Sequence, residues 1–169
     1  CEVNSTFAEK PEPETYTFQY DQLLGTSVEL RFRCESQESA DAAERTALAE
    51  IERLAGILSS YDEQSEFSNW SREKRDFERI SPELFDVLSA AEAWRTKSGG
   101  ALSASAEAVC RLWKDSAKSN RLPSPEGKRA AVLSAMKPAY ELDPLERKAR
   151  RVSDAPLTLN ALAEGFIAD

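Results

Sequence analysis

An alternating pattern of apolar and polar residues predicts β-structure in the first part of the chain. Residues 16–20 and residues 27–34 each alternate, and the short segment Gly25-Thr26 separates them. A period of two is typical of half-buried strands, and a glycine between two such runs allows a tight turn. The pattern therefore predicts a hairpin or two neighbouring strands.

The hydrophobic period then changes to between three and four residues, which predicts helices. Residues 39–59 form one amphipathic helix by this pattern. Ser81-Pro82 is typical of a helix start, because serine caps the first turn and proline fits its first position. Ser98-Gly99-Gly100 is a matching helix end.

Further helices are expected later in the chain, one from Ser103 or Ser105 and one from Pro125 to Met136. Short strands are expected at residues 140–142 and 148–152, and a last helix after Asn160, which we interpret as its N-cap. Residues 66–77 fit neither pattern clearly. Trp94 and Trp113 lie on predicted apolar helix faces, so we expect them in the core.

These elements predict an α+β fold, in which a small antiparallel sheet is packed against several helices. Residues 1–15 are rich in Glu, Pro and Ser, and we expect a flexible tether there. Residues 16–169 are expected to form one domain.

Charge and composition exclude several classes of chemistry. The chain has 169 residues, a formal net charge of −8 and no histidine. Without histidine there is no Ser-His-Asp or Cys-His nucleophile and no imidazole ligand for zinc. Negative charge argues against nucleic acid and anionic membranes as partners. A phosphate ligand is not excluded, since it needs only a local pocket; the basic cluster around Arg72 and Arg75 is interpreted as a solvated face.

The cysteines leave alternatives open. Cys1 followed by a polar tail is typical of a bacterial lipoprotein after signal removal, and the alternative is the start of an expressed fragment. We favour the lipoprotein, anchored through Cys1 on the periplasmic side of a bacterial membrane. Cys34 and Cys110 then form either a disulfide or two buried free thiols, and we favour the thiols.

Candidate ligand contacts also have ordinary structural explanations. The small residues from Ser98 to Ser103 let a backbone approach a ligand, but they also suit a plain connection between helices. Tyr61 follows a helix, where its ring either stacks on a flat ligand or anchors the turn. Glu164 and Asp169 either complement a helix dipole or serve a ligand or metal.

Taken in order, five segments resemble one family, the FAD:protein FMN transferases, or ApbE-type bacterial flavin transferases. The family's motifs are Met-Gly-Thr, Ser-Thr-Tyr with Ser-Glu-Leu-Ser, Val-Ser-Pro-Glu-Leu, Gly-Gly-Ala-Phe-Asp-Pro-Thr with Leu-Trp, and Leu-Gly-Ala-Ile-Ala-Lys-Gly-Tyr-Ala-Val-Asp. The matching segments here are 24–26, 58–68, 80–84, 98–113 and 159–169.

The resemblance implies a reaction. Such enzymes bind FAD as a substrate and use Mg²⁺ to split its pyrophosphate, and FMN passes through a phosphoester to a Ser or Thr of a target flavoprotein. Some members hydrolyse FAD instead, and many are periplasmic lipoproteins. The metal neutralises phosphate charge, so histidine is not required at the phosphate.

The resemblance also implies site residues. The FAD-contacting positions of the family correspond to Leu24, Tyr61, Ala101, Leu102, Ser103, Thr158 and Glu164, and a metal position served by a backbone oxygen corresponds to Ala161. Ser103 and Thr158 replace acids of the family pattern, and Glu164 replaces a lysine that only some members lack.

Three functions remain open from the sequence. The resemblance spans Leu24 to Asp169, and the family's side-chain metal ligands follow the last matching segment, so we expect a domain incomplete at its C-terminus. The first function is the family's FMN transfer. The second is a degenerate or fragmentary, non-catalytic flavin-binding lipoprotein, and the third is a ligand-free envelope interaction module.

Overall fold

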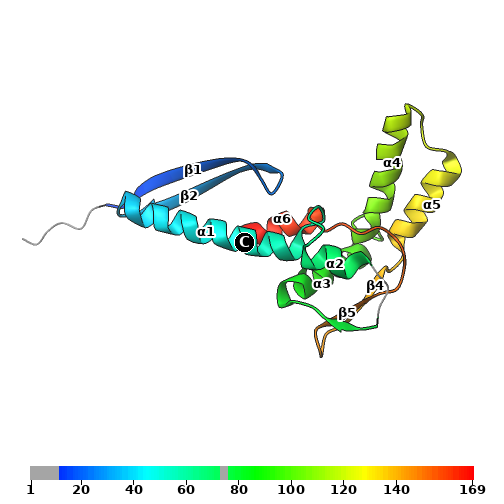
Figure 1. The fold of residues 1–169 in the computed structure, drawn as a ribbon. Coiled ribbons are helices and arrows are strands. Elements are labelled where there is room, and N and C mark those ends of the chain that lie inside the picture. Colours follow the sequence, from blue (N-terminus) through cyan, green and yellow to red (C-terminus); the bar gives the residue numbers. More distant parts are fainter. Residues whose placement is uncertain (1–11, 73–75) are drawn as a thin grey trace, which may run out of the picture. The chain divides into compact units, whose positions relative to one another are not determined.

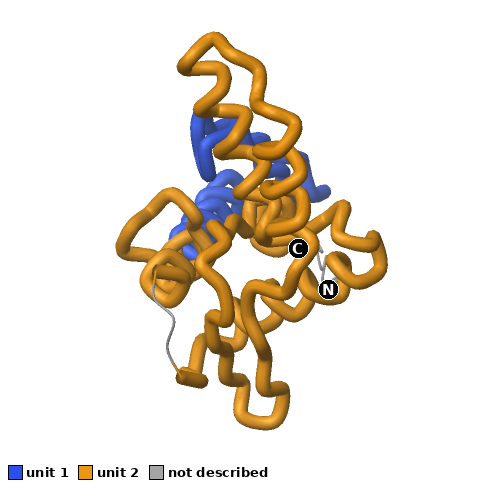
Figure 2. The backbone as a smooth tube through the Cα atoms, turned by 90° about the vertical axis from the view of Figure 1, so that its right-hand side faces the viewer, with its two compact units in different colours: residues 1–52 blue, residues 53–169 orange. Residues whose placement is uncertain are grey.

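The computed structural model describes residues 12–72 and 76–169, so Cys1 and residues 73–75 of the basic cluster lie outside the described part. The chain divides into two compact units, residues 1–52 and residues 53–169 (Figure 2). Strands and helices occur in both units, and both sheets are antiparallel, so the predicted α+β class is confirmed. No described helix combines the length and the apolar character that crossing a membrane requires.

Unit 1 contains the predicted hairpin. Strand β1 (Glu14–Leu23) pairs with β2 (Thr26–Cys34), and both are longer than the alternating pattern predicted. The partly buried side chains of Phe18 and Phe32 meet edge to face, with ring centroids 6.0 Å apart. Gly25 closes the turn at a positive φ of 79°, which explains why the sequence has glycine there.

Helix α1 (Gln37–Leu58) begins in unit 1 and ends in unit 2, and it confirms the helix predicted for residues 39–59 (Figure 1). Within unit 1, the Tyr20 hydroxyl donates a hydrogen bond to the Glu44 carboxylate of α1. That hydrogen bond is the main reason why the pKa of Tyr20 is raised to about 12. It joins the hairpin to the helix.

The core of unit 2 is built around α3 (Pro82–Lys97). Ser81 caps this helix through its side chain, which accepts a hydrogen bond from the backbone N–H of Leu84, as the sequence predicted. Leu84 and Leu88 are completely buried. The hydroxyl of buried Tyr140 donates to the Leu88 carbonyl oxygen at 2.9 Å, which ties α3 to the sheet.

A three-stranded sheet covers part of this core, in the order β3-β5-β4. Its strands are β3 (Glu78–Arg79), β4 (Tyr140–Asp143) and β5 (Lys148–Arg151), and the last two confirm the predicted short strands. The segment that the sequence left ambiguous forms α2 (Glu66–Arg72), which buries Phe67 and Trp70. The Trp70 ring meets the Tyr140 ring edge to face at 5.9 Å.

Two helices form a separate hairpin within unit 2 (Figure 1). A short 3₁₀ turn, η1 (Ala104–Ala106), leads into α4 (Glu107–Ser119), and α5 (Pro125–Met136) follows with Ser124 as its cap. No residue of α4 is fully buried, because the helix packs mainly against α5.

The expectation that Trp94 and Trp113 are core residues is wrong. Their exposed fractions are 49% and 47%. Trp94 lies at the open side of α3 with the Lys97 ammonium 5.5 Å from its ring centroid, and Trp113 lies on the thinly covered α4. An apolar face predicts burial only where the fold brings a partner to it.

Two smaller expectations also need correction. Cys34 and Cys110 are free, as predicted, but Cys34 is half-buried and Cys110 is exposed. Cys34 belongs to β2 and Cys110 to α4, and both follow the apolar pattern of their element. That pattern alone does not distinguish a covered face from an open one. Asn160 is the first residue of α6 (Asn160–Ala168) rather than its cap; Leu159 takes the cap position, and no side chain caps the helix.

Truncation of Leu84 tests the core of unit 2. We expect Leu84→Ala to lower the free energy of unfolding by about 2–5 kcal/mol, because it leaves a cavity in a fully buried site. Leu145→Ala is the matched control: Leu145 is 95% exposed, and its replacement should change stability by less than about 0.5 kcal/mol. Urea unfolding followed by circular dichroism measures both, and equal losses would contradict this description of the core.

Candidate functional site

A pocket in unit 2, with a cavity volume of about 340 Å³, collects most of the site residues predicted from the sequence. Its lining comes from the loop after α1, from the segment around η1, from α4 and from the start of α6. The predicted residues in the lining are Tyr61, Leu102, Ser103, Thr158 and Ala161. The volume lies at the lower end of the range typical of small-molecule sites, about 300–1,000 Å³.

Two backbone hydrogen bonds fix the segment that enters α6. The Thr158 N–H donates to the Ala104 carbonyl oxygen at 2.9 Å. The Leu159 N–H donates to the Ser60 hydroxyl oxygen at 3.0 Å. Since Ala104 belongs to η1 and Ser60 to the loop after α1, these bonds join three distant parts of the chain at the pocket.

Tyr61 presents an exposed ring beside this junction. Its exposed fraction is 78%, so it is not the partly buried anchor that such a turn more often contains. Its hydroxyl oxygen accepts a hydrogen bond from Asn160 Nδ2 at 2.5 Å. The backbone N–H groups of Tyr61 and Asp62 both donate to the Ser59 hydroxyl. The ring is therefore open to a ligand while the backbone that carries it is held.

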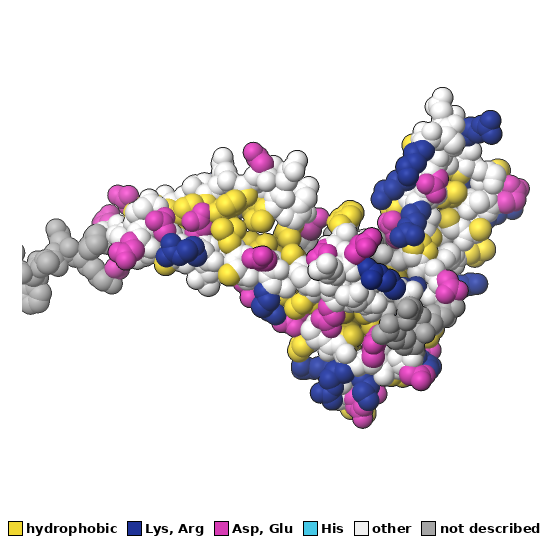
Figure 3. Space-filling view, in the orientation of Figure 1, with side chains coloured by type: hydrophobic (Ala, Val, Ile, Leu, Met, Phe, Trp, Pro, Cys, Tyr) yellow, Lys and Arg dark blue, Asp and Glu magenta, His cyan; other side chains and the backbone are white. Residues whose placement is uncertain are grey.

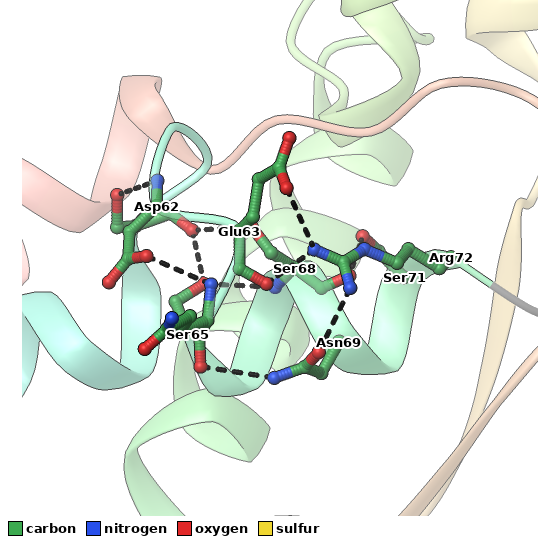
Figure 4. A network of polar contacts seen from close by, with 9 residues as sticks. Asp62, Glu63, Ser65, Ser68, Asn69, Ser71 and Arg72 are labelled. Atoms are coloured by element: carbon green, nitrogen blue, oxygen red, sulfur yellow. Dashed lines mark hydrogen bonds and ion pairs between the residues drawn. The ribbon is translucent and has the colours of Figure 1, made fainter.

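A polar network around the start of α2 supports the same turn (Figure 4). The Ser65 and Ser68 hydroxyls both donate to the Ser59 carbonyl oxygen, at 2.6 and 3.1 Å. The Asp62 carboxylate accepts from the Gln64 N–H at 2.8 Å. These bonds join residues that are close in the sequence, so they order the turn locally. The backbone at Tyr61 therefore has a defined position.

The glycine loop after α3 leads into another wall, which begins at Leu102. The Gly100 N–H donates to the Arg95 carbonyl oxygen at 2.8 Å, and the Leu102 N–H donates to the Ser98 hydroxyl at 2.9 Å. Gly100 has a φ of +89°, and a Cβ there would lie 2.9 Å from Met136 Cγ. The loop thus packs tightly on the end of α5, which positions Leu102 and buried Ser103 at the pocket.

One face of α4 completes the lining with groups that sequence reasoning missed. Glu107, Cys110 and Lys114 recur every three or four residues, so they share one face of the helix. Glu107 accepts a hydrogen bond from Arg111 Nε at 3.1 Å and lies 4.0 Å from the Lys114 ammonium. Their helical spacing can be read from the sequence. No pattern of neighbouring residues indicates that this face of α4 lines a pocket together with the start of α6.

The other predicted residues lie away from the pocket lining. Ala101 is exposed in the glycine loop, and Glu164 is exposed on α6. Leu24 lies in unit 1 at the hairpin turn, with a positive φ of 56°. For these three residues, a role in binding stays a prediction from the resemblance.

The residues present do not form a magnesium site by themselves. Within residues 12–72 and 76–169, no three His, Cys, Asp or Glu side chains come together as metal ligands would. Ala161 is the second residue of α6, where a carbonyl oxygen takes part in the helical hydrogen-bond pattern. A hard cation such as Mg²⁺ normally needs carboxylates as well, and Ala161 offers none.

The geometry defines an α+β domain with a small-molecule pocket where helix ends and loops meet. Comparison with protein families then identifies it: a model of the ApbE family matches residues 24–169. The chain belongs to the ApbE family.

Solved structures agree with this fold. A mutant of the flavin transferase ApbE from Vibrio cholerae superposes with a TM-score of 0.73 at 15% identity, covering 91% of this chain and 53% of its own. The ApbE protein from Thermotoga maritima gives 0.74 at 20% identity, with 91% and 50% covered. The apo flavinyl transferase ApbE from Pseudomonas stutzeri gives 0.72 at 17% identity, with 95% and 51% covered.

The chain spans about half the length of these solved structures. A search of curated proteins gave no match. At these identities the superpositions establish the fold, and the activity is a separate question.

Removal of the Ser60 hydroxyl tests the junction at the pocket. We expect Ser60→Ala to lower the free energy of unfolding by about 1–3 kcal/mol, because it leaves the buried N–H of Leu159 without its acceptor. Thermal and urea unfolding measure the change. Ser119→Ala, in the exposed last turn of α4, is the control and should stay within about 0.5 kcal/mol of the parent. An unchanged stability in Ser60→Ala would show that the junction does not depend on this bond.

Proposed function

We propose that this chain provides the flavin-binding part of an FMN transferase. In the proposed reaction, the hydroxyl oxygen of a Ser or Thr in a target flavoprotein bonds to the FMN phosphorus of FAD. The bond between that phosphorus and the bridging pyrophosphate oxygen breaks, AMP leaves, and the hydroxyl proton is lost to solvent or to a base. Membership of the ApbE family and the flavin transferases among the similar structures support this proposal.

One observation carries the proposal. Residues that the resemblance assigns to FAD come from positions 61, 102–103 and 158, far apart in the sequence, and they line one pocket. If the sequence resemblance were accidental, there would be no reason for these positions to line the same pocket.

The lining offers suitable chemistry for a flavin ring. The exposed Tyr61 ring provides a flat face for stacking, and Leu102 and Leu162 provide apolar walls. The Ser103 hydroxyl accepts a hydrogen bond from the Ser105 N–H, and the Thr158 hydroxyl accepts one from the Asn160 N–H, which orients both groups. Hydroxyls fixed in this way can pair with the polar edge of a flavin.

Binding and catalysis are separable in this proposal. The described residues do not form a Mg²⁺ site alone, so magnesium dependence stays an expectation from the resemblance. A non-catalytic flavin-binding protein shares the same pocket, and it is the second candidate because acids of the family pattern are Ser103 and Thr158 here.

Flavin binding and AMP release distinguish these candidates. The full chain is titrated into FAD while flavin fluorescence is followed, and the mixture with Mg²⁺ is then analysed for AMP by chromatography. Saturable binding with AMP release supports the transferase or an FAD hydrolase, and transfer to a flavoprotein hydroxyl separates those two. Binding without AMP release supports the non-catalytic candidate. Absence of flavin binding overturns both and favours a ligand-free interaction module.

Replacement of Tyr61 tests the stacking role. We expect Tyr61→Ala to weaken flavin binding about tenfold, which corresponds to about 1.4 kcal/mol and falls within the range for ring stacking on an aromatic side chain. Leu122→Ala is the control, because Leu122 is 84% exposed, comparable to Tyr61, and lies outside the pocket lining. Fluorescence titration gives both dissociation constants. Equal affinities in the two variants would remove Tyr61 from the site.

The cellular location stays a prediction from the sequence. Residue 1 lies outside the described part, so lipidation of Cys1 and a periplasmic location rest on the sequence pattern alone. Mass spectrometry of the protein purified from bacterial membranes would detect a lipid on Cys1.

A further inference from the structure

A second pocket in unit 2 is lined by arginines, and the flavin proposal does not use it. Its cavity volume is about 440 Å³. Arg72 from the end of α2, Arg111 from α4 and Arg151 from β5 all contribute to its lining. Tyr61 lines both this cavity and the flavin pocket, so the two cavities are neighbours.

Arg151 is an unusual cation for such a position, because it is 7% exposed. Its Nη1 donates to the Ser71 carbonyl oxygen, and its Nη2 donates to the carbonyl oxygens of Ser153 and Ala155, each at 2.7 Å. The partners of these bonds are all neutral. The Nε–H has no hydrogen-bond partner, and among the described residues it is the one buried polar side-chain atom in that condition.

Burial therefore leaves the Arg151 charge incompletely compensated. Loss of solvent lowers the pKa of Arg151, and the charge of nearby Asp154 opposes that effect in part. A buried cation is destabilising unless an opposite charge or further hydrogen bonds offset the lost hydration. An anion in the cavity would supply the opposite charge, while the guanidinium keeps its bonds to the three carbonyl oxygens.

Arg72 and Arg111 reach the cavity with side chains that are 51% and 62% exposed. Arg72 also donates to the Glu63 carbonyl oxygen and, at 3.2 Å, to Asn69 Oδ1, so its guanidinium is held beside the cavity. Arg72 lies 3.9 Å from the exposed Glu63 carboxylate, as Figure 4 shows, and Arg111 pairs with Glu107 at 3.1 Å. The Arg72–Glu63 pair is exposed on both sides and such pairs contribute about 0–1 kcal/mol, so a ligand can replace it at little loss of stability. Glu107 is only 17% exposed, but the Arg111 side of its pair is open to solvent.

The balance of charge in the lining favours an anion. The three arginines face two lining acids, Glu63 and Asp154, and both acids are exposed. Basic side chains also follow α4 on the visible face of the molecule (Figure 3). This local positive balance contrasts with a chain of net charge −8, whose general field repels anions.

We propose that this arginine-lined cavity binds a phosphate-type oxyanion. Guanidinium groups bind phosphate oxygens through two parallel N–H bonds, and a phosphate has enough oxygens to engage several arginines at once. The oxyanion comes either from the diphosphate of a flavin nucleotide seated in the adjoining pocket or from free phosphate or pyrophosphate. The cavity binds the oxyanion in either case, so the inference does not depend on the proposed transferase.

Direct titration of the full chain with sodium pyrophosphate tests the proposal. Isothermal calorimetry at constant ionic strength should show saturable binding, and the melting temperature should rise with pyrophosphate concentration. Arg72→Gln and Arg111→Gln should each weaken pyrophosphate binding about tenfold, which corresponds to about 1.4 kcal/mol, near the lower end of the range for a hydrogen bond to a charged group.

Arg129→Gln is the matched control, since it removes the same charge from an exposed position of α5 outside the cavity. It should bind pyrophosphate as the parent does. Arg151→Lys keeps the charge but loses the planar guanidinium that donates to three carbonyl oxygens. Urea unfolding and pyrophosphate titration of this variant measure its loss of stability and its loss of affinity separately. No saturable pyrophosphate binding, or equal affinities in the Arg72, Arg111 and Arg129 variants, would overturn the proposal.

Two flavins distinguish the sources of the oxyanion. If it belongs to a flavin nucleotide, FAD should bind more tightly than riboflavin, pyrophosphate should compete with FAD, and Arg111→Gln should reduce the difference. If it is free, riboflavin and FAD should bind equally, and pyrophosphate should bind equally well in saturating riboflavin. Pyrophosphate binding without any flavin binding would leave this inference intact and overturn the proposed function.

Discussion

The candidate site depends on hydrogen bonds between segments that are distant in the sequence. The segment before α6 donates its N–H groups to Ala104 in η1 and to the Ser60 hydroxyl after α1. Both bonds involve backbone groups that are removed from water, where an unmet donor is destabilising by about 1–3 kcal/mol. The bonds therefore hold three chain segments together, and the candidate pocket lies where these segments meet.

Local signals in the sequence predicted the elements well, because the physics that fixes them is local. Ser81 with Pro82 and Ser124 with Pro125 begin helices through bonds that span only three residues. The strands at residues 16–20 and 27–34 followed from alternation alone. Trp94 shows the limit of this reasoning, since an apolar residue on a helix face is buried only if another element covers it.

The candidate site was predictable only in part. The resemblance found Tyr61, Leu102 and Thr158, whose motifs remain readable. It missed Ser60, whose hydroxyl acts on a backbone group about 100 positions away in the chain, a relation that no local pattern expresses. It also missed the arginine-lined cavity, because Arg151 looks like any basic residue of an exposed strand until the sheet and the loop after β5 bury it.

Gly99 and Gly100 are neighbours in the chain, yet they differ in how well they tolerate substitution. Both have positive φ angles, but open space surrounds Gly99, whereas a Cβ on Gly100 would meet both the side chain and the backbone of Met136. Asparagine adopts such φ angles with little strain and would fit at position 99. At position 100 any side chain would contact Met136 of α5, and its backbone would also be strained at a φ of +89°. The loop that leads into the pocket thus has one position that tolerates substitution and a neighbour at which glycine is strongly favoured.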